Sequence, residues 1–383
     1  MPFPGQAGLA VDSRFVAASF NAMKSGLSGI PLLAVAVGML GCGLSGLAVI
    51  LPPSDDPERH TRAPEGDLAG SGWQWQGNWR GFCGTPVSRS LFLTARHVGG
   101  SVGQSFNLNG EAYQTVARFT DPDPKNDLVL WKVCGAFPNW APLVAGDGPS
   151  AGERCVVFGR GLPRGGEVNV TNESEAVLRG WTWGANDGRL RWGLNTVSTN
   201  GSLYLEATFD AASGSDEAML AGGDSGGGLF VQQEGEWRLA GIHYAVDGPF
   251  RYAAGSPAFM AALFDRRGLE EQQEDGSWKG FPAEAGPRPV SFYSTSVLAR
   301  RAWIESVLAA QATPEWPTVE SASGPEGPFE IVVDSTPVEG REAFRLSGQL
   351  PVTFFRLNSC LATEILQLLP VEGGMELRWR WLE

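Results

Sequence analysis

The sequence predicts an all-β protein, and three observations support this prediction. Short apolar runs recur between turn residues from Gly72 onward, namely SLFLTA, DLVLWKV, RCVVFG, LYLEATF, GLFVQQ and RLAGIHYAV, and such runs are typical of strands. The 51 glycines and 26 prolines supply many turns. Within residues 178–194, Asp187-Gly188 separates two alternating runs, which predicts a β-hairpin. Short strands at this density favour a barrel or a sandwich over βαβ units.

Two segments depart from the strand pattern. SVLARRAWIESVLAAQ, residues 296–311, carries apolar residues at helical spacing and predicts an amphipathic helix. Residues 247–288 read as an insertion between two strands, in which FMAALFDRRGLEEQQ, residues 259–273, predicts a short helix and loops.

The N-terminal region predicts export. Residues 26–51 contain no charged residue, a run long enough to span a membrane or to serve as a secretory signal. Lys24 precedes it and acidic residues follow, so the positive-inside rule places the rest of the chain outside the cytoplasm. We therefore interpret residues 1–51 as a signal peptide or a membrane anchor. Both alternatives stay open, with membrane contact through 26–51 if the segment is uncleaved, whereas Cys42 fits a lipoprotein site poorly.

The remaining boundaries follow from composition. Residues 52–71 are polar and rich in Pro, Gly and charge, which predicts a linker in which His60 is solvated. Residues 72–312 form the main β domain, 313–328 a second linker, and 329–383 a small β accessory module whose strands alternate again.

Charge and cysteine usage exclude some functions. The net charge of −13 argues against nucleic acid as a partner. Five cysteines without a CxxC spacing indicate neither a zinc site nor a dense disulfide framework, so we expect no metal and no cofactor. Whether Cys134 pairs with Cys155 is left open by the spacing.

Three motifs carry chemistry. His97 follows an apolar run in LTARHV, Asp127 opens one in NDLVLWKV, and Ser225 stands in the glycine-rich GGDSGGGLFV. A serine hydroxyl needs an adjacent base to act as a nucleophile, and imidazole is suited to that role. A carboxylate on the other ring nitrogen fixes the tautomer. The flanking glycines would let the N–H groups of Gly223 and Ser225 form an oxyanion hole.

These motifs resemble those of the trypsin/chymotrypsin-like serine peptidases over residues 72–310. The resemblance implies two six-stranded antiparallel β-barrels with the triad between them, followed by a C-terminal helix. It also implies a serine endopeptidase that acts on peptides or proteins through an acyl-enzyme on Ser225, with His97 as the base and Asp127 as its orienter. Two alternatives remain: an inactive binding module that keeps the fold, or an esterase with the same triad.

The chain departs from the family pattern in two respects. No IVGG-like segment precedes the first strand, so we expect activity without zymogen cleavage, as in bacterial relatives, although Asp224 precedes the serine. The resemblance places Met219 at the floor of the substrate pocket, beside Leu220, with His243 and Val246 nearby. His243 either lines a pocket for acidic side chains or packs beneath the strand, in which case an apolar pocket is expected.

Overall fold

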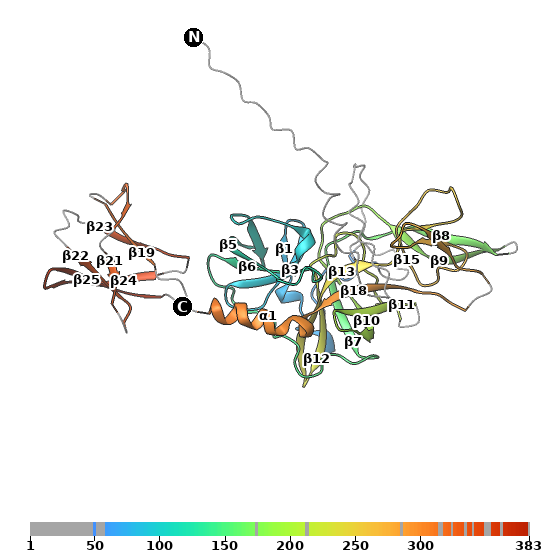
Figure 1. Cartoon of the computed structure of the whole chain (residues 1–383), viewed down its shortest axis with the longest axis horizontal. Helices are drawn as coiled ribbons and strands as arrows, with labels where there is room; N and C mark the ends of the chain where they lie inside the picture. The colour runs from blue at the N-terminus through green and yellow to red at the C-terminus, as the bar shows by residue number, and fades with distance from the viewer. Residues whose placement is uncertain are drawn as a thin grey trace, which may run out of the picture.

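The computed structural model describes residues 49–50, 58–172, 175–210, 214–283, 286–312, 317–322, 325–332, 335–338, 341–347, 354–360 and 363–381. Strands dominate, with one α-helix and three short 3₁₀ turns among these residues. Figure 1 shows two adjoining β bodies and a third, smaller one beyond the helix. No helix among the described residues is long and apolar enough to cross a bilayer. The apolar run 26–51 lies outside them except for Val49 and Ile50.

The first barrel closes in the order β1-β2-β3-β6-β5-β4. Its strands are Gly77–Trp79, Phe82–Pro86, Leu91–Ala95, Ser105–Leu108, Glu111–Thr120 and Leu128–Val133, numbered β1 to β6 along the chain. Every residue of β3 and β6 is buried, because LFLTA and LVLWKV are apolar on both faces. Phe92 and Phe106 stack in its core with ring centroids 4.0 Å apart.

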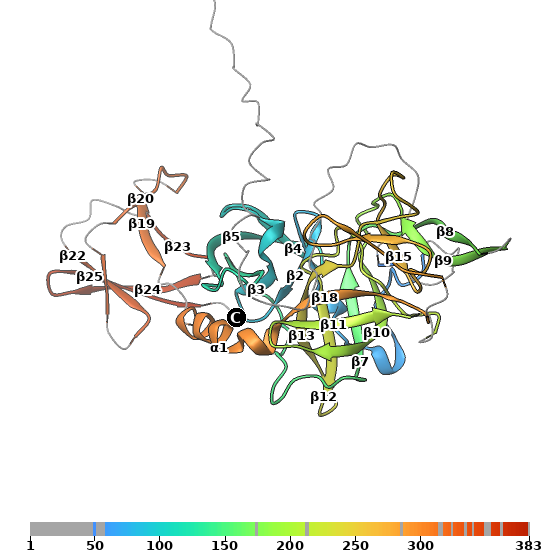
Figure 2. The same cartoon turned by 45° about the vertical axis from the view of Figure 1, so that its right-hand side comes forward.

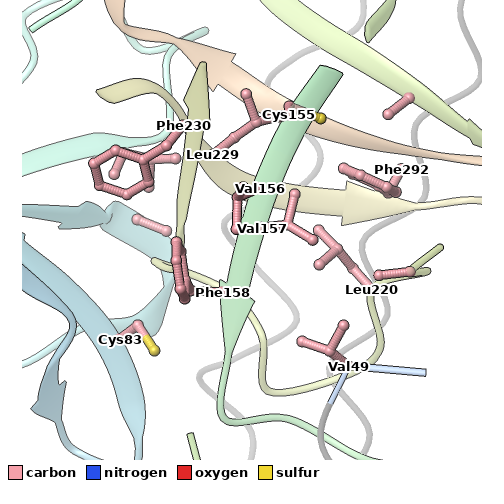
Figure 3. Close-up of a cluster of buried hydrophobic side chains, with 14 of the residues drawn as sticks. Val49, Cys83, Cys155, Val156, Val157, Phe158, Leu220, Leu229, Phe230 and Phe292 are labelled. Carbon is pink, nitrogen blue, oxygen red and sulfur yellow. The ribbon is translucent and has the colours of Figure 1, made fainter. Parts of the chain in front are cut away.

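The second barrel closes in the order β10-β11-β18-β13-β12-β7. Its strands are β7 Arg154–Gly159, β10 Arg191–Asn200, β11 Tyr204–Phe209, β12 Gly228–Gln233, β13 Glu236–Val246 and β18 Val290–Ser296. Figure 3 shows part of its core, where Val156 and Phe158 of β7 lie beside Leu229 and Phe230 of β12. The prediction of two six-stranded antiparallel barrels is confirmed.

The hairpin predicted within 178–194 is wrong. β9, Glu175–Trp183, pairs with β8, Arg164–Asn172, and with β15, Ala261–Leu263, whereas β10 pairs with β7 and β11. A Cβ at Gly180 would lie 2.0 Å from the Ala262 carbonyl oxygen, so glycine here admits β15. The strands on either side of Asp187-Gly188, β9 and β10, belong to different sheets.

The short helix predicted within 259–273 is also wrong. This segment contains β15 and β16, Glu270–Gln272, and β16 joins β14, Phe250–Arg251, and β17, Trp278–Gly280, in a three-stranded sheet. Arg266, between β15 and β16, pairs with Asp247 at 3.2 Å and with Glu271 at 2.7 Å. The pairing of β15 with β9 and the ion pair of Arg266 with Asp247, which lies outside the segment, outweigh the local helical preference.

The helix predicted at 296–311 is confirmed as α1, Val297–Ala310. Ser296 caps it by accepting a hydrogen bond from the Ala299 amide at 3.3 Å. Arg300 pairs with the buried Asp121 carboxylate of the first barrel at 2.5 Å, so the helix joins the end of the second barrel to the first.

The described part of the predicted linker 52–71 packs on the second barrel, and the prediction of a solvated His60 is wrong. The His60 ring stacks on Trp192 with centroids 3.8 Å apart. Its Nδ1 lies 2.8 Å from the Trp192 carbonyl oxygen and its Nε2 3.1 Å from Asp216 Oδ1. Burial lowers the pKa of His60 below its usual value. Polar composition concealed these partners because they lie more than a hundred residues away in the sequence.

The C-terminal module has its own core of Val319, Val332, Phe344, Leu346, Leu377 and Trp379. It holds a three-stranded sheet, β20-β19-β23, and a four-stranded sheet, β21-β22-β25-β24. β19 to β25 are Thr318–Ala322, Glu330–Ile331, Ser335–Pro337, Ala343–Ser347, Phe354–Asn358, Thr363–Val371 and Gly374–Trp381. β19 falls within the predicted linker 313–328, so the module begins earlier than its composition indicates. Figure 2 shows it beside the first barrel, beyond α1.

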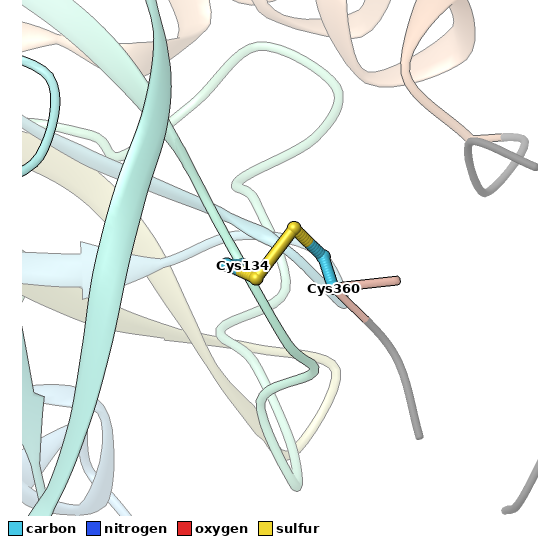
Figure 4. The surroundings of a disulfide bond; sticks show 2 residues. All are labelled: Cys134 and Cys360. Carbon is cyan, nitrogen blue, oxygen red and sulfur yellow. A yellow bond between two sulfur atoms is a disulfide. The ribbon is translucent and has the colours of Figure 1, made fainter. Parts of the chain in front are cut away.

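One disulfide, between Cys134 and Cys360, ties this module to the first barrel (Figure 4). Cys155 is a buried free thiol on β7, as is Cys83 on β2. The pairing of Cys134 with Cys155 therefore does not form, since Cys155 points into the core of the second barrel.

Candidate active site

The first barrel brings His97 and Asp127 together. β3 pairs with β6 so that Ala95 lies opposite Leu128, which places the turn Arg96–Val98 beside the residue that precedes β6. The Arg96 amide donates to the Asp127 carbonyl at 2.9 Å, and the His97 amide donates to Asp127 Oδ1 at 2.9 Å. Strand register and two hydrogen bonds from backbone amides, one to the Asp127 carbonyl and one to its carboxylate, thus hold the imidazole against the carboxylate.

A chain of hydrogen bonds joins the three predicted residues. His97 Nδ1 lies 2.5 Å from Asp127 Oδ2, and His97 Nε2 lies 2.8 Å from Ser225 Oγ. The Nδ1–H donating to the carboxylate leaves Nε2 to accept the serine proton. The Asp127 side chain is 8% exposed and that of His97 32%, so the carboxylate is shielded while the imidazole and serine remain accessible.

Ser225 is presented by a tight turn before β12, and glycine is required at the next position. Gly226 has φ +78°, and a Cβ there would lie 2.3 Å from Thr94 Oγ1 and 2.4 Å from the Cys83 carbonyl oxygen. The Cys83 amide in turn donates to the Ser225 carbonyl at 3.5 Å. The serine turn of the second barrel therefore sits directly on β2 and β3 of the first.

Gly223, one member of the expected oxyanion hole, has φ +97° and lies close to the backbone of Gly161. A Cβ there would lie 2.7 Å from Gly161 Cα. This conformation is open to glycine and lies two residues before the serine. The oxyanion hole formed by Gly223 and Ser225 stays a prediction.

The carboxylate of Asp224 is buried beside the nucleophile and held by backbone amides. Asp224 Oδ2 accepts from the Ala221 amide and Oδ1 from the Gly161 amide, both at 2.8 Å. The Val49 amide also donates to it. Burial raises the pKa of Asp224 from 3.8 to about 7, while these donors oppose the rise.

The contact of Val49 with Asp224 is not predicted by the sequence, which has no IVGG-like segment directly before the first strand. Val49 and Ile50 are 1% and 0% exposed, and Ile50 and Met219 exchange two backbone hydrogen bonds of 2.8 and 2.9 Å. Figure 3 shows Val49 next to Leu220 in the core. The signal available was a β-branched pair, Val49-Ile50, at the end of the apolar run.

The residues proposed for the substrate pocket differ in their surroundings. Met219 and Leu220 are 1% and 2% exposed, and Val246 is half-buried. His243 is 1% exposed, its Nδ1 lies 2.9 Å from Ser294 Oγ, and burial lowers its pKa to about 3. These observations favour a packed, neutral His243 over one that binds an acidic side chain.

Two closed six-stranded barrels, with this trio where they meet, are the architecture of the trypsin-like serine peptidases. The family model described as Trypsin matches residues 63–261, more than half of the 383 residues. The chain belongs to the trypsin family.

Among solved structures, the chain is similar to neuropsin, a serine protease expressed in the limbic system of mouse brain. The identity is 15% and the TM-score 0.37, over 63% of this chain and 97% of the neuropsin chain. A comparison with curated proteins finds no match.

Proposed function

We propose that the protein is a serine endopeptidase. The observation that carries this proposal is the unbroken hydrogen-bonded chain from Asp127 through His97 to Ser225, with distances of 2.5 and 2.8 Å. Such a chain allows a serine hydroxyl to lose its proton as it attacks.

The steps follow from the geometry. Ser225 Oγ attacks the carbonyl carbon of the scissile bond while its proton passes to His97 Nε2, and Asp127 stabilises the resulting imidazolium. The amides of Gly223 and Ser225 would hold the oxyanion. His97 then gives the proton to the leaving amine, the C–N bond breaks, and the acyl group stays on Oγ. Water attacks this ester in the same manner and restores the serine.

Two observations support this activity over its alternatives. An inactive binding module has no need for a buried carboxylate, an imidazole and a hydroxyl in hydrogen-bonded register. The esterases that share this chemistry usually carry their serine on an α/β sheet within GxSxG, whereas Ser225 lies in GDSGG between two β-barrels.

The test uses the chain from Val49 to the C-terminus and its Ser225→Ala variant. A fluorophosphonate probe should label the first and not the second, and a peptide library should be cleaved by the first alone. We expect Ser225→Ala to lower kcat by on the order of 10⁶ and to leave the melting temperature nearly unchanged, because the half-buried hydroxyl contributes little packing. Variant activity within tenfold of the parent would exclude the proposed role.

We further propose that the protein is exported and that the bond before Val49 is cut. Ala48 and Gly46 are small residues at the two positions a signal peptidase selects. A disulfide such as Cys134–Cys360 persists in oxidising compartments. Val49 adopts φ +50°, a conformation that β-branched residues rarely occupy, and a cut before it removes this constraint. The freed α-ammonium would bring a positive charge to Asp224.

Mass spectrometry of the protein from the external medium or the membrane fraction tests this proposal. A chain beginning at Val49 supports it. A chain that retains residues 26–48 and sediments with membranes would instead identify the apolar run as an anchor.

A further inference from the structure

A pair of tyrosines of the second barrel lies against the histidine of the candidate active site. Tyr244 stands in β13 where the pairing with β18 shifts register between His243 and Ala245. Such bulges redirect a side chain. The Tyr244 ring meets the His97 ring edge to face, with centroids 6.1 Å apart and planes at 71°. β13 also packs against β3, the strand that leads into His97.

The second tyrosine connects this ring to the segment that carries Asp127. Tyr204, the first residue of β11, stacks on Tyr244 with centroids 5.3 Å apart and planes at 13°. Tyr204 Oη donates to the carbonyl oxygen of Lys125 at 3.1 Å, two residues before Asp127. The tyrosines thus form a bridge from the second barrel to the turn before β6.

We propose that Tyr244 and Tyr204 are positioning residues that brace the His97–Asp127 pair and shield its carboxylate from water. This inference rests on the proposed peptidase activity and concerns the same site. Neither tyrosine belongs to the motifs from which the triad is predicted. The contact arises because a bulge in one barrel faces a turn in the other.

Burial and charge support this arrangement. Both rings are half-buried. Burial raises the pKa of both hydroxyls, and the negative charge of Asp127 adds to the rise. Arg96 opposes the rise for both hydroxyls, and Asp123 adds to the rise for Tyr204.

The direction in which loss of the Tyr244 ring should shift the pH profile follows from the exposed fractions of the His97 and Asp127 side chains. The His97 side chain is already 32% exposed, whereas that of Asp127 is 8% exposed. Water admitted by removal of the Tyr244 ring would therefore hydrate mainly Asp127. Its attraction for the protonated imidazole would weaken. The acidic limb of the kcat/KM profile would then move to lower pH.

The experiment compares Tyr244→Ala, Tyr244→Phe and Tyr204→Phe in the chain from Val49, with Tyr252→Ala as the control. Tyr252 is an exposed tyrosine packed on Phe259 of the insertion. We expect Tyr244→Ala to lower kcat about tenfold with little change in KM, and to move the acidic limb down by about half a pH unit. Tyr244→Phe keeps the aromatic ring, so the acidic limb of its kcat/KM profile should stay at the pH of the parent.

Tyr204→Phe should lower kcat less than Tyr244→Ala, because it removes the bond to Lys125 and keeps the stack. An unchanged limb in Tyr244→Ala would overturn the shielding role, whatever happens to kcat. An equal shift in Tyr244→Phe would also overturn it, because the hydroxyl and not the ring would then be responsible.

A readout without turnover separates this inference from the proposed function. In Ser225→Ala, the proton between His97 Nδ1 and Asp127 gives an imidazole signal far downfield in the proton NMR spectrum, and the sequence contains only three histidines. Tyr244→Ala in this background should broaden that signal by exchange with water, while Tyr252→Ala should not. A signal equally sharp in both would contradict the shield even if the parent protein cleaves no peptide.

Discussion

The carboxylate of Asp224 shows how one buried residue can link maturation to stability. Its pKa is raised to about 7 by burial, from an ordinary value of 3.8. Between these values the folded state keeps a proton that the unfolded state releases. Stability should therefore fall as pH rises from about 4 to about 7. A neighbouring α-ammonium would favour the charged carboxylate and reduce this fall.

We accordingly predict different pH profiles for two forms of the chain. As pH is raised from 4 to 8, the melting temperature of a chain that retains residues 44–48 should fall more than that of a chain beginning at Val49. Other groups titrate alike in both forms, so the difference isolates the N-terminus. Asp224→Asn in the longer form should abolish this additional fall in melting temperature. Parallel profiles would show that Val49 does not gain a charge beside Asp224.

His243 gives a second prediction at this scale. Burial lowers its pKa to about 3 and its Nδ1 is engaged by Ser294, so the imidazole is neutral at both pH 5.5 and pH 8. We expect the residue before the scissile bond to be apolar at both values, since a neutral imidazole offers no positive charge to an acidic side chain. Cleavage of a peptide library at the two pH values is the measurement. A preference for Glu over Gln that fades as pH rises would restore the acidic pocket.

The turn before β12 is the element on which the nucleophile depends. Gly226→Ala should place a methyl group within 2.4 Å of both Thr94 Oγ1 and the Cys83 carbonyl oxygen, at φ +78°. The turn must move, and Ser225 with it. We expect kcat to fall at least about tenfold together with a lower melting temperature.

Gly188→Ala is the matched control for this prediction. Gly188 has a similar φ of +66° but nothing within 4 Å of the added Cβ, so it tests backbone strain alone, about 1 kcal/mol. If both variants lose kcat equally, the close approach of the two barrels is not what positions Ser225.

Local sequence patterns predicted some elements and missed others for a physical reason. β3, β6 and β12 are short strands rich in apolar residues next to His97, Asp127 and Ser225, so both the strands and the trio could be predicted from the sequence. The sequences of β9 and β10 have the local pattern of a hairpin. In the fold, however, β9 pairs with β8 and β10 pairs with β7, because tertiary packing determines the strand partners. The contacts of Val49 with Asp224 and of Tyr244 with His97 join distant segments, and no local spacing encodes them.

At the scale of the whole molecule, the two hydrophobic cores are separate clusters. We therefore predict that a chain ending at residue 312, with Cys134→Ser to remove the unpaired thiol, folds and keeps its activity. Full-length Cys134→Ser is the comparison, because it loses the disulfide but keeps the module. Peptide cleavage and the cooperativity of thermal unfolding are the measurements. Loss of a cooperative transition on truncation would make the module part of the peptidase core.

The bond between Cys134 and Cys360 spans 226 residues of sequence and encloses Ser225, while His97 and Asp127 lie outside the enclosed stretch. Should the enzyme digest itself in the connection 184–190, the serine would fall on one fragment and its base on the other. The two pieces would nevertheless stay covalently joined. Such a nicked enzyme would migrate as one species until a reductant is added, and it could remain active in two-chain form.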